Sequence, residues 1–540
     1  MRLLTKNVKC LLLLLLFTVS CANEDIDSSA VEDVIVEIPQ EIVLDAYNGN
    51  CTFTKKEALE SLYTKMVRAN VVIYINFMEE YTLDEKCWNK IMGSNYNQSS
   101  VIYDGDTLNL VLGTKFSNDA QNEYLEELKE ESVDIDLCTK SELTSDNYKG
   151  CDSSIDLIDI KSLGAEGLGT ITDIVPFKDY IYVVEKYPGR ILRTNSNFTK
   201  KEIWLDKTND LYCSVLEKTS ETGECGVWSL AFHPTFKYLL LSYTGSENTA
   251  LVEKIYIDDY GWPLIQEKEI IFYDQRTTNV HYSGQLDYSE YLTSFIYSTG
   301  DGFNDIGQSS MTTSPRGKIL LLESDTDLNI PIAPTISSHY SNEPLNNILA
   351  YGFRNPWGIA VWKNTVIVPD VGQELYEEVN KININSIIES GTIPYYGWPI
   401  FEGKKNQYEE INSTSVDWLS KTKYYFNSES IYDAYDYLVK NNTSAEFWYK
   451  HGEGPFGTRV AIIGGGVILK GNWQNYYVYA DHFANELFLM NLITNEVVSA
   501  EIKFDYGFIT NIAAEPKEND TFYIGTFNGE VVKVSIKKSN

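Results

Sequence analysis

The stretch FYIGTFNGEVVKV, residues 522–534, shows the pattern that decides the fold class of this 540-residue chain. An aromatic and β-branched strand, 522–525, is followed by the dipeptide Asn528-Gly529 and then by a valine-rich strand, 531–534. Asn-Gly between two such runs is a strong signal for a tight turn, because both residues accept positive φ angles. The stretch is therefore predicted to form a strand–turn–strand unit.

The same unit recurs at several places upstream. It is found in IYVVEKYPGRIL (181–192) and in YVYADHFANELFL (477–489). At 295–320 a strand leads through the turn Gly300-Asp301-Gly302 and a longer loop to a second strand. Repetition of such units is the signature of a β-propeller, and the chain from about residue 160 onward has room for six blades of roughly 60 residues each. We therefore expect an all-β, six-bladed propeller, with an array of β-sandwiches as the alternative.

A different texture precedes the repeats. Residues 23–48 are acidic and are predicted to be a linker. Thr54 then precedes Glu57 at the spacing of a capping box. Apolar side chains follow at the spacing of an amphipathic helix: Leu59, Leu62, Tyr63, Met66 and Val67. A second helix is predicted at 121–129, so this region is expected to be a small, partly helical cap to which the sequence assigns no chemistry.

The first 22 residues are typical of a signal peptide. Basic residues at the start are followed by an almost unbroken apolar run, 10–19, and then by small residues suited to cleavage, Ser20-Cys21-Ala22. The apolar run is short for a membrane span. An alternative is a lipoprotein signal in which Cys21 becomes lipidated, although Thr18 stands where leucine is usual. The protein is therefore expected to be secreted or extracellular, or anchored by lipid at the cell surface.

Three parts are thus expected: the signal peptide 1–22, the linker and cap 23–155, and the propeller 156–540. Acidic residues outnumber basic ones by 77 to 44, which gives a formal charge of −33 spread along the chain. A surface this negative repels phosphate backbones and anionic lipid, so nucleic acid and peripheral membranes are excluded as partners. A neutral substrate or a cation such as Ca²⁺ remains compatible.

Six of the eight cysteines lie beyond the signal peptide. An even number in an exported chain favours disulfides, and six cysteines allow 15 connectivities. The pairs closest in sequence, Cys138–Cys151 and Cys213–Cys225, are the favoured pairings. Cys51 and Cys87 complete the set, and no spacing matches a CxxC zinc site. We expect these bonds to be structural.

Five segments, in order over about 300 residues, carry a family resemblance. They are VEKYPGRI (184–191), LAFHPTF (230–236), HYSGQL (281–286) with the turn at 300–302, YGFRNPWG (351–358) with EEVN (377–380) and YGWP (396–399), and GGGV (464–467) with YVYAD (477–481). Together they resemble the glucose/sorbosone dehydrogenase family, which includes quinone-dependent sugar dehydrogenases and hedgehog-interacting-protein-like proteins. The resemblance implies a six-bladed propeller, and it does not cover the first 155 residues.

The resemblance also implies a catalytic residue. His281 lies just before Gly284, at the family's position for the general base. Sugar oxidation by a quinone needs a group that accepts the hydroxyl proton as hydride leaves carbon, and a neutral imidazole near pH 7 suits this task. Val280, however, stands where the sugar dehydrogenases of this group carry an acidic partner of the base. The imidazole would then need another group to orient it.

Cofactor binding is implied for Arg354-Asn355, in a turn that Pro356 ends. A guanidinium can hold a carboxylate or quinone oxygen through paired donors, and pyrroloquinoline quinone (PQQ) carries several carboxylates. Packing of Arg354 on Trp357 is the structural alternative. Arg459, just before the glycine-rich turn, is a further candidate for a cofactor carboxylate.

Calcium is the second cofactor that the resemblance implies. Calcium prefers oxygen ligands, and the segment from Asp370 to Glu378 follows the Arg-Asn turn as the family's calcium-binding segment does. Glu378 matches the family's acidic position best. A solvated acidic loop is the alternative.

Two functions remain open at this point. The first is an exported oxidoreductase that uses PQQ and Ca²⁺ to oxidise a sugar or similar alcohol and passes the electrons to an external acceptor. The second is a non-catalytic binding protein of the hedgehog-interacting-protein-like type, whose propeller loops bind a protein or a glycan. If the chain is an enzyme, His281, Arg354 and Glu378 should point toward one central cavity, because the loops of the blades converge at the propeller axis.

Overall fold

The computed structural model describes residues 145–538, with gaps, and a hairpin near residue 100. The gaps are 164–167, 212–223, 246–247, 277–279, 304–305, 326–330, 332–344, 374, 407–436, 452–458 and 501–505. The chain divides into two compact units, one of residues 1–134 and 219–222 and the other of 135–218 and 223–540. Each unit is described by itself.

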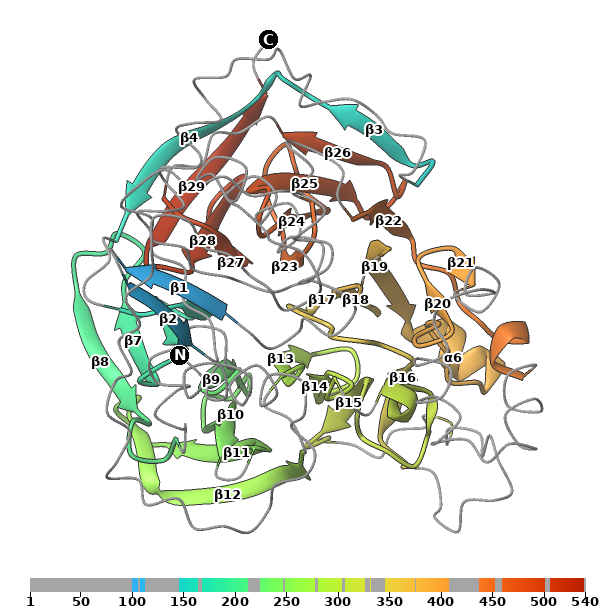
Figure 1. Ribbon diagram of the computed structural model, residues 1–540. Helices are drawn as coiled ribbons and strands as arrows, with labels where there is room; N and C mark the ends of the chain where they lie inside the picture. Colours follow the sequence, from blue (N-terminus) through green and yellow to red (C-terminus); the bar gives the residue numbers. More distant parts are fainter. Residues whose placement is uncertain are drawn as a thin grey trace, which may run out of the picture. The chain divides into compact units, whose positions relative to one another are not determined.

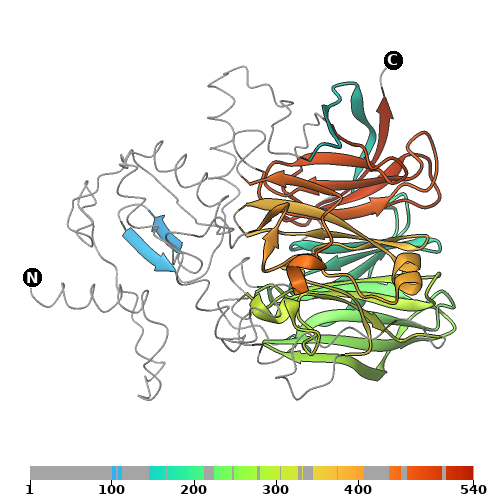
Figure 2. The ribbon, with the colours of Figure 1, turned by 90° about the vertical axis from the view of Figure 1, so that its right-hand side faces the viewer.

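The larger unit is a six-bladed β-propeller (Figure 1). The first three blades, each from its innermost strand outward, are β5 (Ile171–Phe177), β6 (Tyr180–Glu185), β7 (Arg190–Thr194) and β8 (Lys201–Asp206); β9 (Val227–Phe232), β10 (Tyr238–Gly245), β11 (Thr249–Ile257) and β12 (Pro263–Gln275); and β13 (Ser283–Ser289), β14 (Ser294–Thr299), β15 (Lys318–Leu322) and β16 (Ile348–Tyr351). The last three are β17 (Ala360–Trp362), β18 (Thr365–Asp370), β19 (Tyr376–Asn383) and β22 (Phe447–Lys450); β23 (Ile462–Val467), β24 (Tyr476–Asp481), β25 (Glu486–Asn491) and β26 (Val497–Ala500); and β27 (Ile509–Ala514), β28 (Thr521–Thr526) and β29 (Val531–Lys538). Figure 2 shows the sheets of the propeller from the side.

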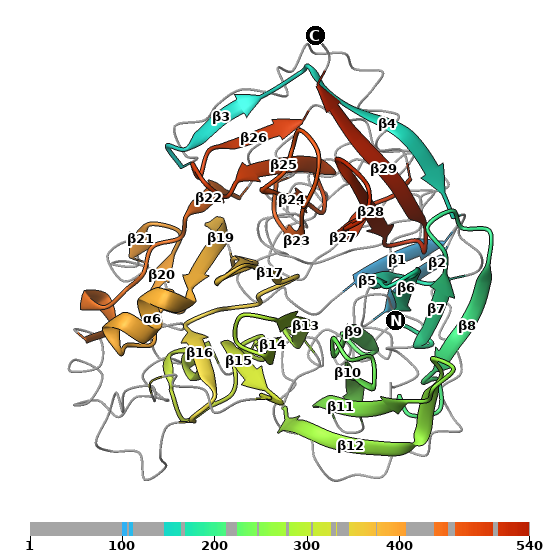
Figure 3. The same cartoon turned by 180° about the vertical axis from the view of Figure 1, so that it is seen from behind.

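Two strands from before the first blade complete the last two blades. β4 (Ile155–Ser162) pairs antiparallel with β29 and so becomes the outer strand of the sixth blade. β3 (Tyr148–Cys151) pairs parallel with β26 as a fifth strand of the fifth blade. Both lie along the outer rim in Figure 3. The compact unit that contains the blades includes both strands, and the boundary at residue 156 stays a prediction.

The strand–turn–strand units identified in the sequence pair as neighbours within blades. β6 pairs with β7, β24 with β25, and β28 with β29, all antiparallel. All six residues of β28 are buried, because a middle strand is covered by the neighbouring blade on each face. Burial on both faces explains why these strands are continuous runs of apolar and aromatic residues rather than alternating patterns.

Side-chain hydrogen bonds tie the innermost strands to one another around the propeller axis. Asp173 of β5 accepts from Ser229 Oγ of β9 at 2.6 Å and from Asn511 Nδ2 of β27 at 3.5 Å. Ser229 Oγ in turn accepts from Leu286 N of β13 at 3.0 Å. Asp287, also in β13, accepts from Val361 N of β17 at 2.8 Å. We call Asp173, Ser229, Asp287 and Asn511 the axial belt; it links five of the six blades.

A short α-helix and two small strand pairs lie outside the blades. α6 (Ile384–Ser390) follows β19 and is capped by Asn383, whose side chain accepts from Ser386 N. β20 (Phe401–Glu402) and β21 (Lys405–Asn406) form a small hairpin after the YGWP segment. In the other unit, β1 (Ser100–Asp104) and β2 (Thr107–Val111) form an antiparallel hairpin, which the sequence did not predict.

Most of the predictions for the N-terminal region concern residues outside the described part of the chain. These are the signal peptide, Cys21, both cap helices, and Cys51, Cys87, Cys138 and Cys213. Cys151 and Cys225 are each disulfide-bonded, and the pairings Cys138–Cys151 and Cys213–Cys225 stay predictions. Within the described part of the chain, no helix is long and apolar enough to cross a membrane.

Candidate functional site

Five of the six candidate residues, all except Arg459, lie at one end of the strands in blades three and four. His281 precedes β13, Asp301 follows β14, and Arg354-Asn355 join β16 to β17. Asp370 ends β18, and Glu378 is near the start of β19. Because neighbouring strands run antiparallel, the start of one strand and the end of the next meet at the same face of the propeller. The fold therefore gathers residues that are up to 97 positions apart.

His281 is oriented by a buried carboxylate. Its Nδ1 lies 2.7 Å from Oδ1 of Asp301. The imidazole and the Phe303 ring pack nearly perpendicular to each other, with their centroids 5.2 Å apart. Asp301 has no exposed surface, and it also accepts from Phe303 N at 2.7 Å and from Trp398 Nε1 at 2.8 Å. We expected Val280 to leave the imidazole without its acidic partner. Asp301, from the Gly300-Asp301-Gly302 turn, occupies that role here.

The electrostatics keep Asp301 ionised. Burial alone would raise the pKa of this carboxyl, but its interaction with His281 and the charge of Arg354 oppose the rise, so the pKa is lowered from its ordinary value. An ionised Asp301 needs a proton on Nδ1 of His281. Nε2 then carries the lone pair and is the nitrogen that can accept a proton.

The turn Gly300-Asp301-Gly302 is recognisable in the sequence, but its aspartate was not predicted to be the partner of the base. The strand register could have revealed it. Ser283 of β13 pairs with Thr299 of β14, so continuing the hairpin by two residues on each side places His281 opposite Asp301. Such a pairing depends on the register of the hairpin, which a sequence with a bulge between residues 283 and 286 does not fix.

Arg354 is held by backbone oxygens next to the same pair. Its Nη1 donates to Val371 O at 2.9 Å and to Gly372 O at 2.6 Å. Its guanidinium lies 5.7 Å from the centre of a Trp398 ring, and it is Trp398, not the Trp357 we weighed, that it stacks near. Asn355 is buried, and its Oδ1 has no hydrogen-bond partner among the described residues.

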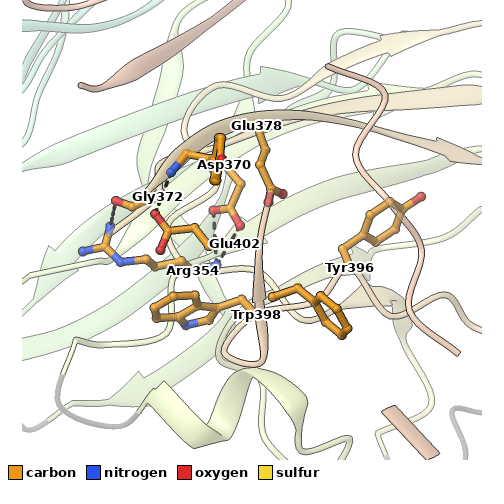
Figure 4. A pocket seen from close by; sticks show the side chains of 9 residues that line it. Arg354, Asp370, Gly372, Glu378, Tyr396, Trp398 and Glu402 are labelled. Atoms are coloured by element: carbon orange, nitrogen blue, oxygen red, sulfur yellow. Dashed lines mark hydrogen bonds between the residues drawn. The ribbon is translucent and has the colours of Figure 1, made fainter. Parts of the chain in front are cut away.

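A small cavity lies beside Arg354 (Figure 4). It has room for roughly one water molecule, about 10 Å³, and is lined by Arg354, Asp370, Gly372, Tyr376, Glu378, Tyr396, Trp398, Phe401 and Glu402. Arg354, Asp370 and Glu378 therefore meet in one place. His281 does not line this cavity; it is connected to it through Asp301, which accepts from the Trp398 indole that does.

Three carboxyl groups face this cavity. Burial raises the pKa of Asp370 to about 7, although backbone N–H groups of Arg354 and Asn355 and the charge of Arg354 oppose the rise. Burial, together with the charge of Asp370, raises the pKa of Glu378 well above its usual range. Glu402, which sequence reasoning missed, accepts from the backbone N–H groups of residues 373, 375 and 376 at 2.8, 2.7 and 2.9 Å.

The donor set of the cavity suits a hard cation in chemistry. Carboxylate and carbonyl oxygens are the ligands that calcium prefers, and a cation would relieve the mutual repulsion of Asp370 and Glu378. The oxygens are partly occupied, since Asp370 accepts from Arg354 N at 2.9 Å and Glu378 from Asn380 Nδ2 at 3.1 Å. In the described part of the chain, no three His, Cys, Asp or Glu side chains are gathered closely enough to hold a metal ion as they stand.

Arg459 lies away from these residues, in the fifth blade. Its Nε and Nη2 donate to the two oxygens of Glu486 at 2.5 and 2.6 Å, and its side chain is 1% exposed. The Phe488 ring packs 5.4 Å from the guanidinium. This arginine is thus already paired within the blade, and it does not join the cluster at His281 and Arg354.

Comparisons with known proteins support a common fold. The family model for Glucose / Sorbosone dehydrogenase matches residues 175–436. A solved glucose dehydrogenase aligns with a TM-score of 0.51 and 16% identity over 70% of this chain and 98% of its own. The apo form of the soluble aldose sugar dehydrogenase from Escherichia coli aligns with a TM-score of 0.50 and 15% identity over 71% and 99%. No curated protein sequence matches the chain.

Proposed function

Because residues 175–436 of this propeller belong to the glucose/sorbosone dehydrogenase family, we propose that the protein is an exported, quinoprotein-type oxidoreductase that oxidises a sugar or a similar alcohol. The observation that carries the proposal is the pair of His281 Nδ1 and Asp301 Oδ1, 2.7 Å apart at the face where the blade loops meet. A histidine with a buried carboxylate on one nitrogen has the other nitrogen free to work as a base.

The chain's own residues would perform the proton chemistry. His281 Nε2 accepts the hydroxyl proton of the substrate, and the resulting imidazolium is stabilised by the ionised Asp301 beside Nδ1. Trp398 Nε1 and Phe303 N hold Asp301 in place through their hydrogen bonds. The His281 side chain is 10% exposed, so bulk water has limited access to the base.

A bound PQQ would supply the two-electron acceptor for the hydride that leaves the substrate carbon. Arg354 and Asn355 are the residues that would hold it, through their side-chain N–H groups. Among the described residues, the buried Oδ1 of Asn355 has no hydrogen-bond partner. Calcium would bind at the cavity of Asp370, Glu378 and Glu402. The electrons would pass to an external acceptor.

A second function has a specific observation in its favour. Nη1 of Arg354 already donates to two backbone oxygens and Arg459 is paired with Glu486, so fewer guanidinium donors are left for a cofactor carboxylate. A hedgehog-interacting-protein-like binding protein, which presents propeller loops to a protein or glycan, needs no such cation. The disulfide pairings named above and a lipid anchor at Cys21 fit either function.

Calorimetric titration of PQQ into the purified chain, with and without Ca²⁺, tests the proposal. We expect one site per chain and tighter binding with calcium. Replacement Arg354→Ala should weaken binding, by about 1.5–3 kcal/mol for each charge-assisted hydrogen bond lost. The matched control is Arg193→Ala, because Arg193 is also buried and paired but belongs to the first blade. Absence of quinone binding under both conditions would leave the binding-protein alternative.

A further inference from the structure

Two buried arginines lie behind His281 and share one carboxylate. Arg276 Nε donates to Asp274 Oδ2 at 3.0 Å, and Arg316 donates to the same carboxylate through Nε at 3.0 Å and Nη2 at 3.2 Å. Arg276 Nη1 also donates to the backbone oxygen of His281. One guanidinium therefore bridges a fixed carboxylate and the main chain of the base.

The main chain at His281 needs such a support. His281 has φ of 57° and Ser283 has φ of 60°, both in the left-handed region that side chains other than glycine rarely adopt. Such conformations persist when the surroundings over-determine them. Tyr282 N donates to Glu224 Oε2 at 2.6 Å, and Gly300 N donates to Tyr282 O at 3.2 Å. Among the described residues, Arg276 is the one whose side chain is seen to donate to the carbonyl oxygen of His281.

Gly300 shows how closely this carbonyl is enclosed. A Cβ atom at Gly300 would lie 2.1 Å from His281 O, so the segment passes against the turn that carries Asp301. The carbonyl thus lies against Gly300 and accepts a hydrogen bond from the Arg276 guanidinium.

Burying the guanidinium of Arg276 costs the folded state free energy. Arg276 is 3% exposed, and its Nη2 has no hydrogen-bond partner among the described residues. Its guanidinium lies 4.9 Å from the centre of the Tyr282 ring. A buried donor without a partner calls for an explanation. The bond from Nη1 to His281 O gives a reason for an arginine at this position, because an apolar side chain could fill the space but could not hold the carbonyl.

We propose that Arg276 is a positioning residue for the base: by bridging Asp274 and the carbonyl oxygen of His281, it holds His281 in the conformation that directs Nδ1 at Asp301. A catalytic role of Arg276 rests on the proposed function. The conformation of His281 that Arg276 holds does not depend on that function, and it can be measured in the protein without cofactor or substrate.

The test is nitrogen-15 NMR of the histidine rings in the full chain. The chain has five histidines, and His281→Gln assigns the signals of His281. In the wild type we expect one tautomer, with the proton on Nδ1 and a downfield Nδ1–H resonance from the bond to Asp301. In Arg276→Gln we expect averaging between tautomers and loss of that resonance. If the protein turns over, kcat should fall on the order of 10²-fold with KM little changed, as for a small misplacement of a catalytic group.

Arg193→Gln is the matched control. Arg193 is also buried, pairs with one carboxylate (Glu202 Oε1, 2.8 Å) and donates to one backbone oxygen (Gly261 O, 3.1 Å), but in the first blade. Its replacement should leave the His281 signals unchanged. A folded Arg276→Gln protein with wild-type His281 signals would overturn the proposal.

Arg276→Lys carries the test if Arg276→Gln does not fold. An ammonium is a point donor and cannot bridge Asp274 and His281 O as a planar guanidinium does. We expect tautomer averaging in this variant as well, and an unaltered spectrum would overturn the proposal. Altered His281 signals in a protein that binds no quinone would instead uphold the positioning role and refute only the proposed enzyme.

Discussion

Asp301 decides whether His281 can act as a base. It is the group that fixes which ring nitrogen carries the proton, and it is held by three donors: His281 Nδ1, Phe303 N and Trp398 Nε1. An amide in its place would keep the shape but could present its N–H₂ to Nδ1. The ring would then carry its proton on Nε2, and the lone pair would face away from the substrate.

Asp301→Asn is therefore expected to lower kcat by roughly 10²–10⁴-fold, the usual contribution of general-base catalysis, with little effect on quinone affinity. Steady-state dye reduction and calorimetry measure the two effects. Asp520→Asn is the control, since Asp520 is also buried but accepts from Asn472 N and Trp473 N at the edge of the fifth and sixth blades. Equal activity in both variants would show that Asp301 does not orient the base.

Candidate site residues could be identified from the sequence where they lie inside a recognisable family motif. His281, Arg354, Asp370 and Glu378 all lie at one face of two adjacent blades, and their functional roles stay predictions. The partners were harder to predict. Asp301 depends on the register of a bulged hairpin, and the pairing of Arg459 with Glu486 depends on two strands of blade five meeting in space. Residue types and spacing do not determine such contacts.

At the scale of elements, the closing strand β4 joins the first part of the propeller to its last blade. Ile155 in β4 is 1% exposed and belongs to the core of blades five and six, whereas Ile160 in the same strand is 47% exposed. The strand is buried at its start and exposed towards its end, and the sequence pattern alone could not show this. β3 is harder still, because it pairs in parallel with β26 across about 350 residues.

Ile155→Ala is expected to lower the free energy of unfolding by about 2–5 kcal/mol, through lost burial and a residual cavity. Ile160→Ala should change it by less than about 0.5 kcal/mol, as for most surface substitutions. Urea unfolding of the propeller measures both. Equal effects of the two substitutions would mean that β4 does not close the propeller as described.

The axial belt gives the innermost strands a pH-dependent stability. Burial and the charge of Asp287 raise the pKa of Asp173 to about 7, although hydrogen bonds from Ser229 Oγ, Leu230 N and Ile174 N oppose the rise. The unfolded chain ionises this carboxyl near its ordinary value of 3.8. Between these values the folded state binds the proton and the unfolded state does not, so the contribution of Asp173 to stability falls as pH rises from about 4 to about 7.

Asp173→Asn should therefore make the decline of unfolding free energy between pH 5 and pH 7.5 shallower, by up to about 1.4 kcal/mol per pH unit. Urea unfolding at several pH values in this window measures the slope. Asp179→Asn, at an exposed position of the same blade, is the control and should leave the slope unchanged. The same slope in wild type and Asp173→Asn would contradict the raised pKa.

At the scale of the whole molecule, the repeat pattern was sufficient to predict six blades, and the structure confirms them. The cavity shared by blade four and the YGWP segment could not be predicted, because Glu402 reaches Asp370 and Glu378 only through the small β20–β21 insertion. The cavity has three carboxyl groups, and two of them have a raised pKa. A cation that replaces the protons of these groups would bind the folded state and so raise the free energy of unfolding.

Calcium at a concentration on the order of 1 mM, suited to weak extracellular sites, should therefore raise the melting temperature relative to chelator. Glu378→Gln should abolish that rise. Glu515→Gln, a buried glutamate paired with Tyr523 in the last blade, should retain it. Differential scanning calorimetry measures the shift, and a wild-type melting temperature indifferent to calcium would contradict binding at this cavity.

The most direct test of the proposed enzyme is dye-linked oxidation of a panel of aldoses by the chain reconstituted with PQQ and Ca²⁺. The measurement compares the wild type with His281→Ala at equal quinone occupancy. We predict dye reduction with at least one sugar and a loss of about 10²–10⁴-fold in kcat in His281→Ala, because the proton acceptor is removed while Arg354 and Asn355 remain. Activity that survives undiminished in His281→Ala, or no dye reduction with any sugar by a wild type that holds the quinone, would contradict the account.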